Sequence, residues 1–152
     1  MSRSLTDADY TGLLAFRDQL RRFLHWSEQQ AIASGITPAQ YQLLLAVRGH
    51  PAGTPTVRDV AEHLLLRHHS VVGLIDRAEA ADLVERRPDP GDHRVVRLRL
   101  TASGARVLRR LAGLHLDELR RRPPTLDAAL LDGRADIDDH ADDHADDQEG
   151  ES

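Results

Sequence analysis

The sequence predicts a mainly helical α+β fold, in which two long helices precede and follow a pair of short helices and a two-stranded β hairpin. Three observations carry this prediction. Apolar side chains recur at helical spacing up to residue 82 and again after residue 101. Between these stretches, VERRPDPGDHRVVRLRLT at 84–101 has two strand-like runs around a turn rich in proline and aspartate. The length of 152 residues suits one domain with appendages.

Composition excludes several classes of protein. The chain has no cysteine, which rules out disulfides, thiolate zinc sites and thiol-based oxidation sensing. Its longest apolar runs, such as LLLAV at 43–47, are too short to cross a bilayer. The first ten residues, MSRSLTDADY, lack the apolar core of a signal peptide. We therefore expect a cytoplasmic protein without a membrane partner.

Charge is distributed unevenly along the chain. Residues 132–152 hold ten carboxylates and one arginine, a net charge of −9. Residues 1–131 hold fifteen carboxylates and nineteen arginines, a net charge of +4, and the two parts account for the overall −5. Eleven of the arginines lie between residues 86 and 122, together with four carboxylates. An acidic tail therefore conceals a basic body, which is typical of a protein that binds nucleic acid.

The first long helix is predicted over 7–34, and Gly35 follows it in the usual C-terminal position. Its apolar side chains repeat in alternating three- and four-residue steps, the pattern of a helix that packs along another helix. This seam consists of Leu13, Phe16, Leu20 and Phe23, and it is widened by Leu14 and Leu24.

The second helix begins at a strong start signal, TPAQ at 37–40. Thr37 can cap the helix, Pro38 suits its first turn, and Gln40 can complete a capping box. The helix is expected to stop near the HPAGTP loop at 50–55. Its predicted buried residues are Tyr41, Leu44, Leu45 and Val47.

The next two helices are predicted to form a helix-turn-helix at about 56–82. Thr56 offers another capping-box start for a short helix that ends near Leu64. The following helix spans about 67–81. Its buried side consists of Val71, Leu74, Ile75 and Ala78, and its other face presents His68, His69, Gly73 and Arg77.

The hairpin is predicted to form a wing over 84–100. Its second strand alternates apolar Val96, Leu98 and Leu100 with Val95, Arg97 and Arg99, so that one face packs while the other meets water or phosphate. A helix pair followed by a basic hairpin is the layout of a winged helix-turn-helix. We therefore expect the chain to bind DNA.

A second long helix opens at Thr101 and ends at the two prolines 123 and 124. A short helix is predicted at 125–131. The folded domain then spans 1–131, with dimerisation helices at 7–34 and 101–131. Residues 132–152 are expected to be a disordered tail, because they combine dense like charge with little apolar content. The seam of the second long helix consists of Val107, Leu108, Leu111, Leu114 and Leu119.

Three segments carry a resemblance to a known family. They are TPAQYQLLLAV at 37–47, DVAEHLLLRHHSVVGLIDRAEAADLVERR at 59–87, and DHRVVRLRLTASG at 92–104. Together with the order of the predicted elements, they resemble the multiple antibiotic resistance regulator (MarR) family over roughly residues 8–122. The most specific piece is Asp92 and Arg94 of the wing, followed by Leu100 and Thr101.

The resemblance implies a homodimeric transcription factor that binds pseudo-palindromic double-stranded DNA, usually as a repressor released by a small ligand. It also implies that residues 67–81 are the recognition helix. In such proteins the wing arginine, here Arg94, enters the minor groove, and Asp92 would orient its guanidinium.

The chain departs from the family pattern at several positions. Leu65 and Asp82 replace glycines, although aspartate tolerates the left-handed conformation better than most residues. Arg67 stands where a capping serine is frequent, and His69 where proline is frequent. These differences affect the turn geometry and the operator sequence. The final helix is also short, which implies a weaker dimer.

The candidate DNA contacts lie on the recognition helix and the wing. Exposed residues at the start of a recognition helix read base edges, and wing arginines are attracted to phosphates and narrow minor grooves. The alternatives are a solvated hairpin and, for Arg77, an ion pair with Asp76 or a nearby acid. The candidates are Arg67, His68, His69, Ser70, Gly73, Arg77, Arg86, Arg87, Asp92, Arg94 and Arg97, with Arg99 as a further phosphate contact.

The adjacent His68 and His69 lead to a hypothesis about pH. Protonated histidine attracts phosphate, so operator affinity is expected to rise as the pH falls from about 7.5 to about 6. An unchanged dissociation constant in constant salt would reject this hypothesis. The alternative is that the two side chains only cap and solvate the helix.

A small-molecule effector is a further expected partner. His25, Trp26 and Glu28 lie late in the first helix, where the resemblance places the family's ligand cleft between the dimer helices and the DNA-binding lobe. The alternative for Trp26 is packing in the core or in the dimer, the commoner role for an isolated tryptophan on an amphipathic helix.

No cofactor, metal site or catalytic site is predicted. The chain has no glycine-rich phosphate loop, nucleophile elbow or paired carboxylates outside the tail, so we expect no enzyme. His140 and His144 are four residues apart, but a disordered tail binds metal weakly. The alternative functions are a winged-helix protein-interaction module and a metal-responsive regulator that uses the acidic, histidine-containing tail.

Overall fold

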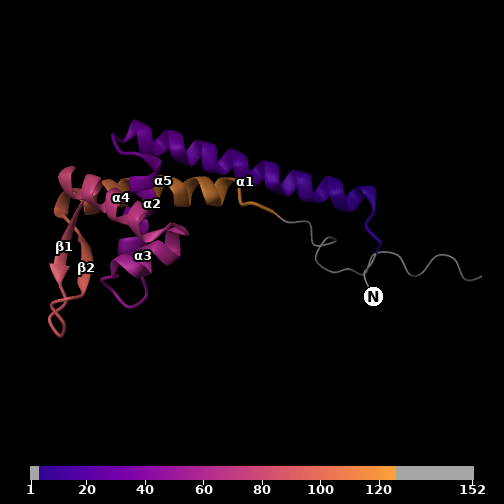
Figure 1. Cartoon of the computed structure of the whole chain (residues 1–152). Coiled ribbons are helices and arrows are strands. Elements are labelled where there is room, and N and C mark those ends of the chain that lie inside the picture. The colour runs from indigo at the N-terminus through magenta and orange to yellow at the C-terminus, as the bar shows by residue number, and fades with distance from the viewer. Residues whose placement is uncertain (1–3, 126–152) are drawn as a thin grey trace, which may run out of the picture. The chain divides into compact units, whose positions relative to one another are not determined.

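The computed structural model describes residues 4–125. The elements follow one another as α1 (Asp7–Ala33), α2 (Pro38–Gly49), α3 (Val57–Leu64), α4 (His68–Ala80), β1 (Val84–Pro88), β2 (Val96–Leu100) and α5 (Ala102–Arg121) (Figure 1). The predicted winged helix-turn-helix fold class is thereby confirmed. The described residues form two compact units, 4–19 with 124–125 and 20–123. The predicted helix at 125–131 and the tail at 132–152 lie outside the described residues, apart from Thr125.

The smaller unit contains the beginning of α1. The Thr6 amide donates to the Asp9 carboxylate (2.8 Å), and the Asp9 amide donates to the Thr6 hydroxyl (3.3 Å). This reciprocal capping satisfies backbone donors that the first helical turn leaves free. In the same unit, Gln19 donates to the Thr125 carbonyl (3.3 Å) and accepts from the Thr125 amide (3.0 Å).

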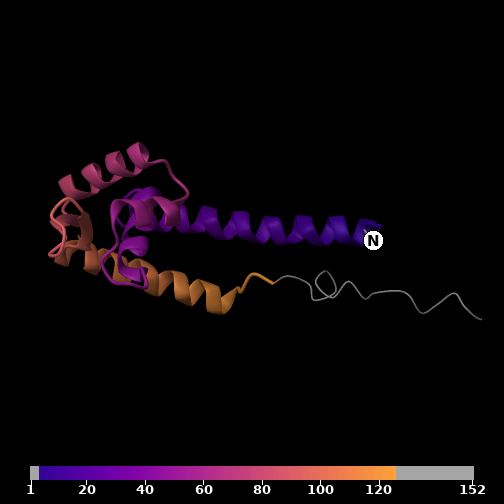
Figure 2. The same ribbon diagram turned by 60° about the horizontal axis from the view of Figure 1, so that its bottom comes forward.

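α2 is the central helix of the larger unit. It contacts α3, α4, α5 and β2, and Figure 2 shows α4 and α5 on opposite sides of it. The predicted capping box of Thr37 and Gln40 is present. The prediction that Leu45 is buried is wrong, because its side chain is 47% exposed. Leu43 is fully buried instead, since neighbouring elements approach α2 from more than one side.

α3 and α4 form the predicted helix-turn-helix. Thr56 caps α3 in a capping box with Asp59. At the end of α3, Leu65 adopts the left-handed conformation with φ of 54°, where a residue other than glycine costs about 1–2 kcal/mol. Leu65, which replaces the glycine expected from the resemblance, thus lies at a position where the backbone has a positive φ. All four residues predicted for the buried side of α4 are buried, namely Val71, Leu74, Ile75 and Ala78.

The wing is an antiparallel pair in which Val84 lies opposite Leu100 and Pro88 lies opposite Val96. Leu98 is fully buried, in agreement with the predicted alternation. The loop before α3 adds to the same sheet, because the Leu98 amide donates to the Pro55 carbonyl (2.8 Å) and Thr56 forms a bridge with Arg97. β2 is therefore fixed to the loop before α3.

The start of α5 is held against the end of α4. The Thr101 hydroxyl donates to the Asp82 carbonyl (2.6 Å), and the Thr101 amide donates to the Leu83 carbonyl (3.1 Å). Asp82 has a φ of 57°, so it occupies the conformation expected for the glycine that it replaces. A Cβ at Gly104 would lie 1.9 Å from the Leu83 oxygen, so glycine permits this close approach. α5 ends at Arg121, just before the two prolines, as predicted.

Candidate nucleic-acid interface

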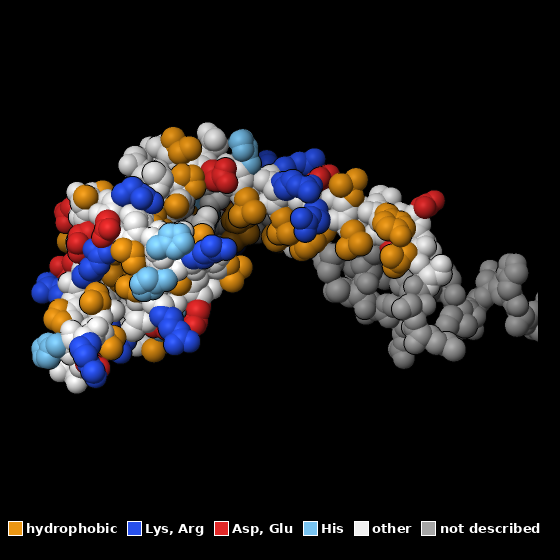
Figure 3. Space-filling model, viewed as in Figure 1, with side chains coloured by type: hydrophobic (Ala, Val, Ile, Leu, Met, Phe, Trp, Pro, Cys, Tyr) orange, Lys and Arg blue, Asp and Glu red, His pale blue; other side chains and the backbone are white. Residues whose placement is uncertain are grey.

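The leading end of α4 is exposed. Its N-cap residue, Arg67, makes no side-chain capping bond. The predicted base-reading residues Arg67, His68, His69 and Ser70 are all exposed, because the opposite side of the helix faces the core. Figure 3 shows arginine and histidine side chains gathered over the region of α3, α4 and the hairpin. This surface offers hydrogen-bond donors and positive charge to a polyanion.

Gly73 and Arg77 are neighbours on successive turns of α4. A Cβ built on Gly73 would lie 3.3 Å from Arg77 Nη1, so the bare glycine leaves room for the guanidinium to lie along the helix. Arg77 is exposed and has no ion pair within residues 4–125. The alternative pairing of Arg77 with Asp76 is not formed, because Asp76 binds Arg86.

Arg86 is engaged by carboxylates of α4. Its guanidinium donates to Asp76 (2.6 Å) and to Glu79 (3.0 Å), and its amide also donates to Glu79 (3.1 Å). These bonds connect β1 to the outer side of α4. The geometry therefore gives Arg86 a structural task, whereas the DNA contact predicted for it remains a prediction.

Glu85 holds two further wing arginines. It accepts from Arg87 (3.1 Å) and from its cross-strand partner Arg99 (2.5 Å). Hydrogen bonding from Arg99 in particular lowers the pKa of Glu85 below its ordinary value. All three side chains remain accessible to solvent, so both arginines can exchange this carboxylate for a phosphate.

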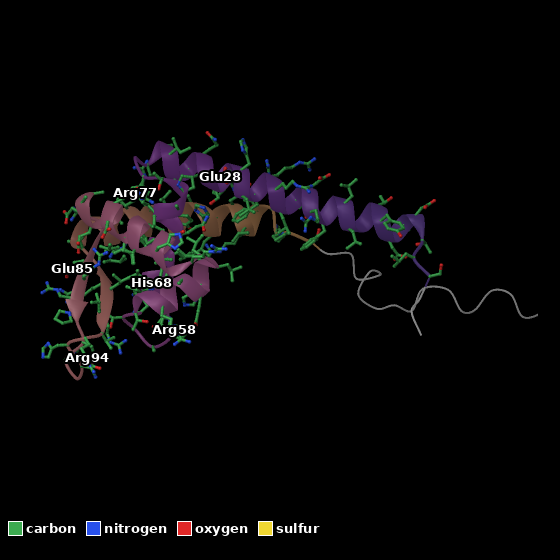
Figure 4. All side chains as sticks on the ribbon, viewed as in Figure 1. Glu28, Arg58, His68, Arg77, Glu85 and Arg94 are labelled. Carbon is green, nitrogen blue, oxygen red and sulfur yellow. The ribbon has the colours of Figure 1, made fainter. Side chains whose placement is uncertain are left out.

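Asp92 and Arg94 form a two-bond pair at the tip of the wing. Arg94 Nε and Nη2 donate to the two Asp92 oxygens at 3.0 and 3.1 Å. These bonds from Arg94 lower the pKa of Asp92 and raise the pKa of Arg94. The Arg94 side chain is 90% exposed and lies at the far end of the hairpin (Figure 4). The pairing that the resemblance implies is thus present.

Arg97, also predicted to contact DNA, points back toward the protein. Its Nε donates to Asp89 (2.6 Å), and its Nη1 donates to the Thr54 carbonyl (3.0 Å). Asp89 and Thr54 were not identified from the sequence. The PDPG turn was a usable signal for Asp89, because aspartate at such a position commonly binds backbone amides two and three residues ahead.

An aromatic cluster surrounds a buried histidine on α5. His115 lies 4.5 Å from the Tyr41 ring centre and 5.0 Å from that of Trp26, and burial raises the pKa of Tyr41. His115 Nδ1 donates to the Leu111 carbonyl (2.7 Å), and its Nε2 shares a hydrogen bond with the Ser27 hydroxyl (2.7 Å). The leucine seam of α5 gave no sign of this residue.

A shallow hollow of about 390 Å³ lies beside this cluster. It is lined by Trp26 of α1 and by Leu114, Asp117, Arg120 and Arg121 of α5. The other two predicted ligand residues, His25 and Glu28, are exposed and do not line it.

A histidine pair joins the end of α2 to α3. His50 Nδ1 and His63 Nε2 share a hydrogen bond (3.0 Å), and His50 Nε2 lies 3.6 Å from Asp59. Within residues 4–125, no three histidine or carboxylate side chains are arranged to hold a metal ion. His140 and His144 lie outside the described residues. Over the same described range, no helix is long and apolar enough to span a bilayer.

Comparisons with known proteins bear on the same region. A model of the MarR family matches residues 34–95, from the start of the α1–α2 connection to the wing tip. Over these residues the chain is similar to the MarR family. The transcriptional repressor NicR of Pseudomonas putida is 35% identical over 81 residues, which are 53% of this chain and 50% of NicR. The chain spans about half the length of the curated relatives that it matches.

Solved structures of MarR-family regulators have a similar fold. AbsC from Streptomyces coelicolor has a TM-score of 0.67 and 25% identity, and the match covers 79% of this chain and 81% of AbsC. A MarR mutant from E. coli, complexed with operator DNA, has a TM-score of 0.60 and 24% identity over 69% of this chain and 74% of that chain. The second likeness concerns the fold alone.

Proposed function

We propose that the protein is a sequence-specific DNA-binding transcriptional regulator that acts as a homodimeric repressor in the cytoplasm and is not an enzyme. The observation that carries the proposal is that the larger unit presents two candidate DNA-binding surfaces, one on α4 and one on the wing. The leading end of α4 is exposed and basic, and Arg94 is held outward by Asp92 at the tip of the wing. NicR is a transcriptional repressor, and the E. coli MarR mutant is complexed with operator DNA.

The two surfaces suit the two grooves of DNA. A helix fits the major groove, where arginine and histidine can reach base edges. Arginine is attracted to the negative potential of a narrow minor groove. α4 would therefore supply sequence discrimination, and the wing would supply affinity and orientation.

Dimerisation is proposed from apolar side chains that the single chain leaves exposed. Leu13, Leu14 and Leu24 of α1 are 50–60% exposed, and Leu114 and Leu116 of α5 are 37% and 51% exposed. Such side chains on long helices are suited to burial against a second copy. A two-fold dimer would place its recognition helices about 34 Å apart, one turn of DNA.

A small-molecule effector is proposed at the hollow beside Trp26. Trp26 offers an apolar face there, and Arg120 and Arg121 offer positive charge. An effector changes DNA affinity only if it binds the DNA-competent and the DNA-free arrangements with different strength. Binding here would do so by changing the separation of the recognition helices.

Selection of bound duplexes from random or genomic DNA tests the proposed function. The expected result is a pseudo-palindromic site with half-sites centred about one helical turn apart. Recovery of unrelated sequences, or of single half-sites without symmetry, would contradict the proposal.

A further inference from the structure

A continuous set of hydrogen bonds runs from the loop before α3 to the tip of the wing. It begins at Arg97 of β2, whose guanidinium binds the Thr54 carbonyl (3.0 Å) and the Asp89 carboxylate (2.6 Å) at the same time. Arg97 is also joined to this loop through its backbone, by the bridge with Thr56. The position of the Asp89 carboxylate is therefore set from the helix-turn-helix.

Asp89 in turn holds the backbone of the wing turn through hydrogen bonds. Its second oxygen accepts from the Gly91 amide (3.1 Å) and the Asp92 amide (3.0 Å), and its own amide donates to the Val95 carbonyl (2.8 Å). The backbone of Asp92 is thus fixed by Asp89. The Asp92 carboxylate then holds both the amide and the guanidinium of Arg94.

The side chains of Arg94, Arg97 and Asp89 differ in how far they are exposed to solvent. Arg94 is 90% exposed, whereas the side chains of Arg97 and Asp89 are only 35% and 21% exposed. Hydrogen bonding from Arg97 also lowers the pKa of Asp89. In the absence of DNA, the Arg97 guanidinium is therefore already bound to Asp89 and to the Thr54 carbonyl.

We infer that Arg97 and Asp89 are positioning residues that orient Arg94 for DNA through the wing turn. This inference rests on the proposed function. It replaces the direct DNA contact predicted for Arg97 with an indirect task. The physical gain is entropic, because a long side chain that is held in its bound orientation loses less freedom on binding.

The inference predicts an effect opposite to that of simple electrostatics. Asp89→Asn removes a negative charge from a surface that faces a polyanion, so charge alone predicts tighter binding. Positioning predicts weaker binding, by about two- to tenfold, the loss expected when one more long side chain must be ordered. The matched control is Glu85→Gln, which removes another wing carboxylate but leaves the turn intact. This control is expected to bind as tightly as the native chain or more tightly.

A double-mutant cycle with Arg94 provides the decisive test on a selected duplex. In an Arg94→Ala background, Asp89→Asn and Arg97→Gln should weaken binding no further. Arg97→Gln alone should weaken binding without changing the slope of log affinity against log salt, whereas loss of a phosphate contact lowers that slope by about one. Unfolding midpoints equal to the native value confirm that each variant is folded.

Tighter binding by Asp89→Asn, or additive losses with Arg94→Ala, would overturn the inference and leave the proposed function standing. Absence of specific binding by the native chain would overturn both.

Discussion

Arg94 and Arg86 lie in the same hairpin and have different surroundings. Arg86 is 27% exposed and binds carboxylates of α4, whereas Arg94 is 90% exposed and binds only Asp92 among the described residues. Asp92 lies on the same exposed tip, so its bond holds the guanidinium outward without covering it. A side chain held in this way is ready to enter a groove.

Arg94→Ala should weaken binding to a selected operator by roughly tenfold or more and should reduce its salt dependence, because a groove contact and a positive charge are both lost. Titrations at several salt concentrations measure both effects. Arg109→Ala removes the same charge from an exposed position on α5 and serves as the control. Equal losses in the two variants would show that charge, not wing position, determines affinity.

Individual side chains were predictable from the sequence to different degrees. Asp92 and Arg94 are two residues apart, so their pairing depends on local geometry that a motif can specify. The partners of Arg86 and Arg97 are seven or more residues away, and their bonds depend on how β1, α4 and the loop before α3 meet. His115 was missed because the sequence around it does not indicate its hydrogen-bond partners, the Ser27 hydroxyl and the Leu111 carbonyl.

At the scale of single elements, the helix starts were the most predictable features. Threonine with glutamine or aspartate three residues later specified the starts of α2 and α3, because a capping box involves only neighbouring residues. Burial was less predictable on α2. Leu43 and Leu45 differ by the neighbouring elements that reach them, and helical periodicity carries no information about those neighbours.

The α3 cap links stability to acidity. The hydrogen bond from the Thr56 amide (2.9 Å) is the main cause of the lowered pKa of Asp59. A carboxyl group whose pKa is lower in the folded state than in the unfolded state stabilises the fold at pH values above its unfolded-state pKa. This stabilisation is lost as the pH falls through its folded-state pKa. The free energy of unfolding should therefore decrease below about pH 4. Urea titrations of the native chain and of Asp59→Asn should show a smaller acid loss in the variant, and equal losses would contradict the assignment.

Two glycines of α5 provide a matched pair of substitutions. Gly104→Ala places a Cβ 1.9 Å from the Leu83 oxygen, so the junction of α4 and α5 must move, at a cost of about 1–3 kcal/mol or more. Gly113→Ala meets no atom within 4 Å and should stabilise the helix by about 0.5–1 kcal/mol. Chemical denaturation of both variants measures the difference. A neutral Gly104→Ala would show that the close approach is not needed.

At the scale of the whole molecule, charge is the property that the sequence alone specifies most clearly. Residues 133–152 carry nine carboxylates and one arginine, so their deletion removes a net −8 and changes the net charge from −5 to +3. Deletion should tighten DNA binding, and most strongly at low salt, because like charges repel less when screened. Unchanged affinity at low salt would contradict this prediction and would favour a tail that engages another partner.

The central claim is that α4 and the wing together recognise a specific DNA site. The most direct measurement compares the dissociation constants of the full chain for its selected duplex and for a scrambled duplex of equal length, at physiological salt. We expect the selected duplex to bind at least about 1,000-fold more tightly. Equal affinity for the two duplexes would contradict this claim.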